Sequence, residues 1–382
     1  LDTLIRQTLE ELDGTRLYFS ESTSEEILRN NIGGTADGPY TVREPLWFFT
    51  EKWHPFNPEI GSVGLPNMES LKKMMDEKDL VVPAGKEINE VWKYHKYQGY
   101  GGMIERMGEP EDLKDFVTKA QLVNYDQYRS LVEGHTSHMW DWYTGFLVWK
   151  SQNPWPALKG QFYDWYLDQN AGYYGFKHGA APLHLQFNPV DSAIYAVNAT
   201  PKERKGLRFD AVLTDEGGKE IWKRSQETVL PPNSITKVWD LDLRGAPAKI
   251  QLLKLRITYV STGLPIDDNT YWFPYNGDGK TLMGLDPAKV VGQMMKSNKD
   301  RYTVDLANSG NVAAFFVRMK VVRASDGEMV TPVFFDDNYI VLLPGEKRSV
   351  QVDVTKLKED DRKTPLLLQL EGVNLPGQMI RL

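Results

Sequence analysis

The sequence contains no cysteine among its 382 residues. Disulfide bonds, thiol nucleophiles and thiolate metal sites are therefore excluded, whereas secreted, periplasmic and vacuolar or lysosomal compartments all stay compatible with the composition. No run of apolar residues reaches the length of a membrane-spanning helix, so we expect no membrane partner. The net charge is −7 without any basic stripe, so we expect no nucleic-acid partner either.

Several familiar catalytic motifs are also missing. There is no Gly-x-Ser-x-Gly elbow, no phosphate-binding Gly-Lys-Ser/Thr loop and no His-Glu-x-x-His zinc helix. His135 and His138 stand three residues apart in a helical pattern, which a solvated helix face explains more often than a metal site does. We therefore predict neither a cofactor nor a metal.

Aromatic residues are abundant, at 12% of the chain with 11 Trp and 18 Tyr. Their flat faces suit the binding of sugars or peptides, although large β-rich proteins also use such residues in their cores.

The chain length suits two or three domains. Residues 1–12 have the apolar spacing of an amphipathic helix and not of a signal peptide, which is typical of the middle of a longer polypeptide.

Two kinds of pattern divide the chain. In residues 1–178 we predict a short strand over 16–19, helices over 67–76 and within 109–138, and a buried strand over 143–150, which is α/β organisation. After about residue 178, short β-branched runs alternate with Gly and Pro turns, as in β-sandwiches.

The β-rich half also repeats itself loosely. A run at 195–198 leads to one at 209–213, and a similar run at 302–308 leads to one at 317–322. We interpret the repeats as two immunoglobulin-like sandwiches, over 179–276 and 277–382, although such patterns also coincide by chance. Residues 276–299 resemble a linker with a helical piece.

Glu59 is the one carboxylate of a short apolar segment, Phe-Asn-Pro-Glu-Ile-Gly-Ser-Val-Gly-Leu-Pro over 56–66. A buried glutamate must be paired, protonated or used, because burying its charge is costly. The flanking residues predict that Glu59 lies at the carboxyl end of a strand, which is where a barrel of alternating strands and helices does its chemistry. A lone glutamate is more often a surface-loop residue, and the segment by itself leaves this alternative open.

Tryptophans follow at strand or loop positions, so that carboxylate and indole rings can meet at one barrel mouth. This combination suits glycoside hydrolysis, because an anion stabilises the oxocarbenium-like transition state while the sugar packs on indole. For Trp47, Trp140 and Trp142 we expect core packing instead.

The segment around Glu59 resembles the nucleophile strand of glycoside hydrolase family 2. Residues 119–125 and 145–168 resemble most the mannosylglycoprotein endo-β-mannosidase branch, and residues 12–16 resemble the strand that precedes the nucleophile. The resemblance implies that the chain is the C-terminal portion of a (β/α)8 TIM barrel, over 1–178, followed by the two sandwiches.

The resemblance also implies roles for single residues. Glu59 would be the nucleophile, and Trp149 the floor under the bound sugar. Asn153 and Trp155 follow on the next loop, and Trp92 and His95 match a Trp-x-Tyr-His loop near the site. Asn57 is expected to orient the strand without touching sugar.

The family's general acid/base is a Glu that follows an Asn on an earlier barrel strand. Asn89-Glu90 comes after Glu59, in the wrong order. We therefore expect an upstream fragment or a partner chain to complete the barrel and to supply the acid. The predicted function is retaining hydrolysis of β-mannosidic bonds, such as Man-β1,4-GlcNAc of N-glycan cores. The alternatives are an exo-β-D-glucosaminidase and a non-catalytic carbohydrate-binding or assembly subunit.

Overall fold

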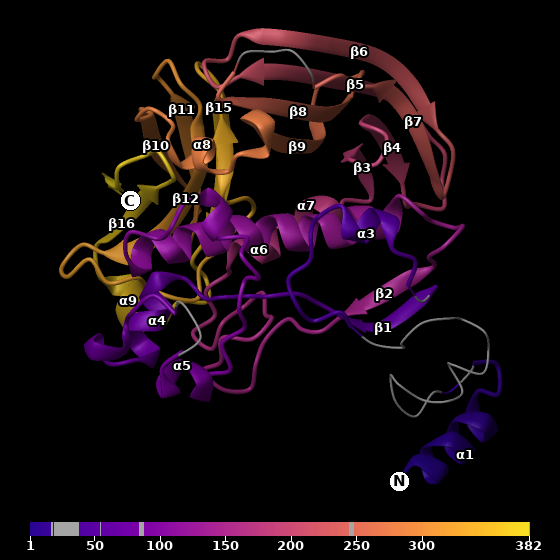
Figure 1. The fold of residues 1–382 in the computed structure, drawn as a ribbon, viewed down its shortest axis with the longest axis horizontal. Coiled ribbons are helices and arrows are strands. Elements are labelled where there is room, and N and C mark those ends of the chain that lie inside the picture. The colour runs from indigo at the N-terminus through magenta and orange to yellow at the C-terminus, as the bar shows by residue number, and fades with distance from the viewer. Residues whose placement is uncertain are drawn as a thin grey trace.

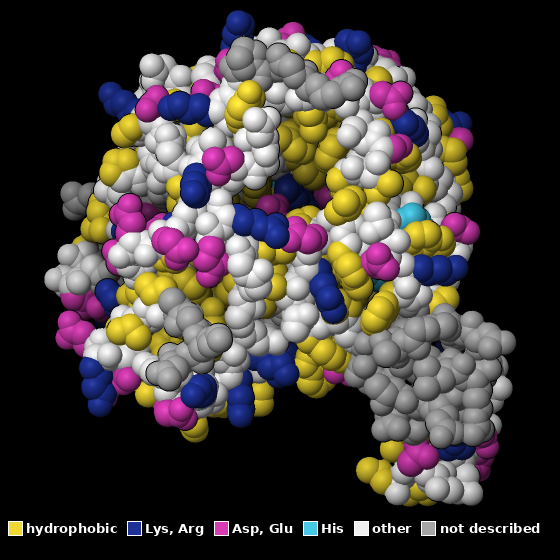
Figure 2. All heavy atoms as spheres, in the orientation of Figure 1, with side chains coloured by type: hydrophobic (Ala, Val, Ile, Leu, Met, Phe, Trp, Pro, Cys, Tyr) yellow, Lys and Arg dark blue, Asp and Glu magenta, His cyan; other side chains and the backbone are white. Residues whose placement is uncertain are grey.

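The computed structural model describes residues 1–382 except 17, 19–37, 54, 84–87, 244–247, 299 and 382. Two helices, α6 (Leu113–Thr136) and α7 (Ala171–Gly179), run across the middle of the molecule. Two β-rich parts lie on one side of these helices, and the pair β1–β2 with short helices lies on the other (Figure 1). On the face shown in Figure 2, basic and acidic side chains are interspersed.

The first part of the chain contains a two-stranded parallel sheet. Strand β1 (Phe56–Ile60) pairs with β2 (Gly145–Val148), with Phe56 opposite Gly145 and Ile60 opposite Val148. The other elements of this part are α1 (Asp2–Leu12), α3 (Trp47–Thr50), α4 (Met68–Met74), η1 (Glu77–Asp79), α5 (Glu90–Tyr94) and η2 (Glu105–Met107). The predicted helices over 67–76 and within 109–138 therefore correspond to α4 and α6.

Helix α6 is buried along most of its length, because it is covered from several sides. Its first turn is capped by Asp112, whose side chain accepts the N–H of Asp115 at 2.8 Å. Helix α7 packs closely against it: a Cβ on Gly175 would lie 2.1 Å from the carbonyl oxygen of Tyr125. Glycine at this position therefore allows the two helix backbones to touch.

The first sandwich consists of a sheet in the order β3-β4-β7 and a sheet in the order β6-β5-β8-β9. The strands are β3 (Leu183–Asn188), β4 (Ala193–Asn198), β5 (Arg204–Asp215), β6 (Glu220–Leu230), β7 (Ser234–Asp240), β8 (Ile250–Tyr259) and β9 (Pro265–Pro274). Their inward side chains form a separate apolar core that includes Leu185, Phe209 and Leu255.

The second sandwich has the sheet orders β10-β11-β15-β13 and β14-β12-β16-β17. The strands are β10 (Val290–Asn298), β11 (Arg301–Asn308), β12 (Ala314–Arg323), β13 (Phe334–Phe335), β14 (Ile340–Leu342), β15 (Lys347–Asp353), β16 (Leu366–Glu371) and β17 (Gln378–Arg381), with the helix α9 (Glu359–Lys363). The expected linker over 276–299 holds η3 (Tyr275–Gly277) and α8 (Lys280–Met283), but its second half is β10. The linker prediction was wrong there because an edge strand needs few apolar residues.

The two sandwiches share a buried asparagine at the same point of the repeat. Asn198 ends β4, and its Nδ2 donates to the carbonyls of Lys202 and Leu230 at 2.9 and 3.3 Å. Asn308 ends β11, and its Nδ2 donates to the carbonyls of Val312 and Leu342, both at 2.8 Å. The sequence repeat therefore corresponds to a repeated structural device, which ties one strand end to a distant strand.

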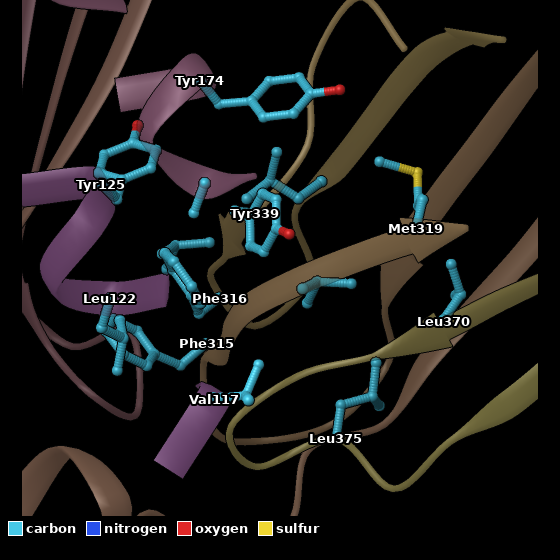
Figure 3. Close-up of a cluster of buried hydrophobic side chains, with 14 of the residues drawn as sticks. Val117, Leu122, Tyr125, Tyr174, Phe315, Phe316, Met319, Tyr339, Leu370 and Leu375 are labelled. Carbon is cyan, nitrogen blue, oxygen red and sulfur yellow. The ribbon is translucent and has the colours of Figure 1, made fainter. Parts of the chain in front are cut away.

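The second sandwich shares its core with α6 and α7. Figure 3 shows Tyr125 of α6 and Tyr174 of α7 close to Phe316 of β12 and to Tyr339. The Phe316 and Tyr339 rings lie 5.0 Å apart, and those of Tyr125 and Phe316 lie 5.9 Å apart. This continuous apolar contact fixes the sandwich against the helices.

Buried charges add to this junction. Arg318 of β12 donates to Glu69 of α4 at 2.9 Å, to Asp168 at 3.2 Å and to Glu371 at 2.8 Å. Lys320 pairs with Glu69 and Glu371 as well. Burial would raise the pKa of the Glu69 carboxyl, but the two cations hold it well below its usual range.

A second polar junction ties α6 to the first sandwich. His184 of β3 is fully buried between Glu133 of α6, at 3.0 Å, and Asp267 of β9, at 2.9 Å. Burial alone would lower the pKa of His184, but Asp267 and Glu133 raise it to about 10. The imidazole is therefore a cation at neutral pH.

The predicted strand over 16–19 lies partly outside the described residues, since 17 and 19 are not described, and Arg16 and Tyr18 are not in a strand. The strand over 143–150 is present as β2 but is not buried, because Leu147 is 57% exposed. The boundaries 1–178, 179–276 and 277–382 stay predictions; α7 ends at Gly179 and β3 begins at Leu183.

Candidate active site

Glu59 lies one residue before the end of β1, with its backbone held from both sides. The Oδ1 atom of the buried Asn57 accepts the N–H of Glu59 at 3.0 Å, while its Nδ2 donates to the carbonyl of Gly38 at 2.9 Å. The N–H of Gly38 in turn donates to the Glu59 carbonyl at 2.6 Å. Asn57 therefore orients the strand, as expected, and the half-buried Glu59 side chain extends from a fixed backbone.

Trp149 directly follows β2 and meets the end of β1. Its N–H donates to the carbonyl of Ile60 at 2.8 Å. A Cβ on Gly61 would lie only 2.0 Å from the Trp149 carbonyl oxygen, so this contact requires glycine. The Trp149 side chain is 44% exposed. Because β1 and β2 are parallel, Glu59 and Trp149 belong to the same sheet edge.

The loop over 149–161 is braced from inside by Asn153. This side chain is 4% exposed, and its Nδ2 donates to the Lys159 carbonyl at 2.8 Å and to Oε1 of Gln161 at 2.5 Å. A Cβ on Gly64 would lie 2.4 Å from the N atom of Gln161, so the loop also presses on the segment after β1. The structure thus brings Asn153 to the site region, with its amide nitrogen used within the loop.

Lys150 lies beside the Trp149 ring, and Lys159 lies near Lys150. The Lys150 Nζ lies 5.1 Å from the centroid of the Trp149 ring, and the Lys150 N–H donates to the Gly160 carbonyl at 3.3 Å, beside Lys159. Burial and the charge of Lys159 lower the pKa of the Lys150 amine. In the described part of the chain, neither ammonium has a carboxylate within ion-pair distance. The sequence patterns gave no signal for this pair.

His95 and Trp155 are brought together at the tip of the loop. Their rings are stacked with centroids 6.0 Å apart and planes 16° apart. The His95 Nδ1 lies 2.6 Å from the Pro156 carbonyl. Tyr94 completes this aromatic cluster, which sequence reasoning recognised only in part.

Trp92 is a core residue, contrary to the expectation of a contact with substrate. Its side chain is 0% exposed, and its Nε1 donates to the Asp79 carbonyl at 2.9 Å. Its ring contacts those of Tyr97 and Phe116. Trp92 faces inward from the short helix α5, whereas Tyr94, two residues later, faces outward. The Trp-x-Tyr-His pattern does not distinguish these two directions.

Other aromatic and histidine expectations are also corrected. His135 and His138 do not form a solvated face, because His135 stacks on Tyr143 at 4.3 Å and His138 on Trp142 at 3.7 Å. Trp140 is 54% exposed and so is not a core residue. Trp47 and Trp142 are half-buried.

Asn89 and Glu90, the one Asn-Glu pair considered for the acid, have structural and surface roles. Asn89 caps α5, where its Oδ1 accepts the N–H of Trp92 at 3.0 Å, and Glu90 is a surface residue paired with Lys93. Among the residues that the structure describes, no group of three or more His, Asp or Glu side chains has the arrangement of a metal site. None of the described helices is long and apolar enough to cross a membrane.

Family models match both sandwiches. A mannosidase Ig/CBM-like domain matches residues 191–274, and an exo-β-D-glucosaminidase Ig-fold domain matches residues 269–375. A mannosylglycoprotein endo-β-mannosidase of Lilium longiflorum is 31% identical over 89% of this chain and 44% of its own length. An exo-β-D-glucosaminidase of Arthroderma benhamiae is 28% identical over 91% of this chain and 43% of its own length.

The chain belongs to glycoside hydrolase family 2.

Solved structures of this family agree with the fold. An exo-chitosanase of Amycolatopsis orientalis superimposes with a TM-score of 0.78 at 25% identity, over 90% of this chain and 45% of that one. A β-D-mannosidase of Dictyoglomus thermophilum gives 0.75 at 19% identity, over 97% of this chain and 44% of that one. The predicted fold class, a C-terminal barrel portion followed by two immunoglobulin-like sandwiches, is confirmed. The chain spans less than half the length of the curated relatives given above.

Proposed function

We propose that this family 2 chain carries the nucleophile of a retaining glycoside hydrolase that cleaves β-mannosidic bonds, such as Man-β1,4-GlcNAc in N-glycan cores. The observation that carries the proposal is the joint placement of Glu59 and Trp149 at one end of the β1–β2 pair. In the reaction, a Glu59 oxygen attacks the anomeric carbon as the glycosidic C–O bond breaks. A second carboxyl group protonates the leaving oxygen and later removes a proton from the water that releases the sugar.

The second carboxyl group comes from outside this chain. Retention requires the two carboxyl groups to lie about 5–5.5 Å apart across the barrel mouth. An upstream fragment or partner chain that completes the barrel would supply it. Support comes from apolar side chains that a complete barrel would cover: Leu4 and Leu9 of α1 are 64% and 42% exposed, and Leu147 of β2 is 57% exposed.

The lysine pair favours a neutral sugar over glucosamine. Lys150 lies against the Trp149 ring, and Lys159 lies near Lys150. Among the described residues, no carboxylate forms an ion pair with either lysine. An ammonium-bearing sugar on Trp149 would meet like charges, which disfavour its binding. A mannoside has no charge to repel. This observation supports the β-mannosidase over the exo-β-D-glucosaminidase.

Replacing Glu59 with Gln in the native enzyme tests the nucleophile. The Gln side chain keeps the size of Glu but cannot form the glycosyl-enzyme, so we expect kcat to fall by more than about 100-fold while oligosaccharide still binds. The matched control is Glu90→Gln, because Glu90 is a surface glutamate whose side chain is 87% exposed and pairs with Lys93. Its activity should equal that of wild type.

The same experiment separates the alternatives. A Glu59→Gln variant that keeps more than about one hundredth of the rate contradicts nucleophilic catalysis by Glu59. Mass spectrometry of the native assembly then tests the missing acid. An associated polypeptide segment with an Asn-Glu strand supports the enzyme, whereas a monodisperse, cooperatively folded chain 1–382 without it favours the non-catalytic binding protein.

A further inference from the structure

Strand β6 lies at the open edge of its sheet. In the sheet order β6-β5-β8-β9 it pairs with β5, and no described strand lies on its other side. It runs along the outer margin of the first sandwich (Figure 1). Along β6 only Leu230, its last residue, is buried. The backbone N–H and C=O groups along this edge are therefore open to pairing with another strand.

The middle of β6 is a regular strand. Its pairing with β5 runs without interruption from Trp222 to Thr228, and the shifts in register lie outside this range. The carbonyl of Lys223 is reached by a side chain of the same strand, since it accepts Nη1 of Arg224 at 2.9 Å. Seven consecutive residues therefore offer one unbroken row of backbone groups to a further strand.

The sequence of β6 is complementary to itself. When two copies run antiparallel about Ser225, residues equally far from it on either side lie opposite one another. Lys223 of each copy then faces Glu227 of the other, and Trp222 faces Thr228. Opposite charges, and an aromatic residue opposite a β-branched one, stabilise an antiparallel pair when they are directly opposite. Twofold symmetry makes each of these contacts twice.

The side chains of β6 are available for these contacts. Glu227 is exposed and forms no ion pair among the described residues. Lys223 has a long surface ion pair with Glu220, at 3.7 Å, in which 54% and 55% of the two side chains are exposed. Ile221 and Val229, near the two ends, are 38% and 44% exposed, and the antiparallel arrangement brings them together. Covering them would remove apolar surface from water.

Other arrangements of two such strands are less favourable. A parallel pair in register sets Lys223 against Lys223. An antiparallel pair centred one residue earlier sets Arg224 against Arg224 and Lys223 against Ser225. Centred one residue later, it sets Lys223 against Val229 and Glu227 against Ser225. Like charges directly opposite destabilise a strand pair, so the charges favour antiparallel pairing about Ser225.

We propose that β6 joins this chain to a second copy of itself by antiparallel pairing about Ser225, so that two sandwich sheets become one sheet across a twofold axis. A single strand pair is smaller than the roughly 1,200–2,000 Å² of a standard interface, so the dimer should dissociate on dilution. The inference goes beyond the proposed function and does not depend on it, because no residue of β6 belongs to the candidate active site.

The test is sedimentation velocity of the native enzyme from about 1 to about 100 μM. Wild type should pass from one copy of the chain per particle to two over this range. Glu227→Lys sets like charges opposite each other at two places, so we expect the dissociation constant to rise at least about 10-fold. The double variant Lys223→Glu with Glu227→Lys exchanges the two charges, restores both pairs and should dimerise like wild type. The control Glu328→Lys makes the same charge change at an exposed position after β12 and should have no effect.

The possible results separate the proposal from its alternatives. A wild type with one copy per particle at every concentration overturns it, whether β6 is free or is covered by an upstream domain. A dimer that Glu227→Lys leaves unchanged forms through another surface and also overturns it. Weaker dimerisation without recovery in the double variant contradicts pairing about Ser225. Recovery supports the proposal, because an unrelated surface would not respond to the exchange of these two charges.

Discussion

Replacing Gly61 with Ala tests how the β1–β2 pair builds the site. A Cβ at this position would lie 2.0 Å from the Trp149 carbonyl oxygen, whereas real contacts of a Cβ atom are essentially never under 3.0 Å. The difference, 3.0 minus 2.0, means that the two backbones must separate by about 1 Å. Both are backbone atoms, so a side-chain rotation cannot relieve the clash.

The expected losses follow from this displacement. Separation lengthens the hydrogen bond from the Trp149 N–H to the Ile60 carbonyl, now 2.8 Å, next to Glu59. A misplacement of about 1 Å in a catalytic arrangement costs about 100-fold in rate. Overpacking of a close contact costs about 1–3 kcal/mol of stability. We therefore expect Gly61→Ala to lose about 100-fold in kcat/KM while the enzyme stays folded.

The assay is steady-state hydrolysis of an aryl β-mannoside by the native enzyme, with circular dichroism to verify folding. The control is Gly99→Ala, because a Cβ on Gly99 meets nothing within 4 Å and its backbone is not in the left-handed region. Gly99→Ala should keep full activity. If folded Gly61→Ala retained wild-type activity, the contact between the end of β1 and Trp149 would not be part of the site, and our reasoning would be refuted.

Two further predictions concern the buried charges. Burial and the nearby Asp168 raise the pKa of Asp164 to about 7. The folded protein therefore becomes less stable as the pH rises from about 4 to about 7, because Asp164 keeps its proton in the folded state and loses it in the unfolded state. Asp164→Asn removes this cost, and the free energy of unfolding in urea should become less dependent on pH over that interval; an unchanged slope contradicts the assignment. Arg318→Met leaves three carboxylates beside only one remaining cation, so we expect a loss of about 3–5 kcal/mol in urea unfolding. The matched variant Arg301→Met removes a surface ion pair, in which 59% of the arginine side chain is exposed, and should cost under about 1 kcal/mol. Equal losses for the two variants would show that the buried Arg318 cluster stabilises the fold no more than a surface ion pair does.

Local patterns in the sequence were sufficient for several elements. The apolar period over 109–138 and the cap at Asp112 predicted α6, because a helix buried on a long stripe must show that period. The position of Glu59 near a strand end followed from the Gly and Pro residues that come after it. The sandwiches followed from short runs and turns, and the shared asparagines Asn198 and Asn308 explain why their repeat was visible at all.

Burial and side-chain direction could not be predicted in the same way. Trp92 and Tyr94 are two residues apart, yet one is fully buried and the other is 67% exposed. The difference depends on Asp79 and Phe116, which contact Trp92 from other parts of the chain. Trp140 was misjudged for the same reason, since an indole suits a core and a surface equally.

The sequence by itself therefore determined the family, the fold class and the strand that carries Glu59. Only the tertiary structure decided which aromatic rings face solvent, that Lys159 lies near Lys150, and that Tyr94 meets Trp155. The physical reason is that strand and helix patterns depend on neighbouring residues, whereas contacts between rings and between charges depend on segments far apart in the chain. His95 and Pro156, whose contact joins the end of α5 to the loop over 149–161, are separated by 61 positions.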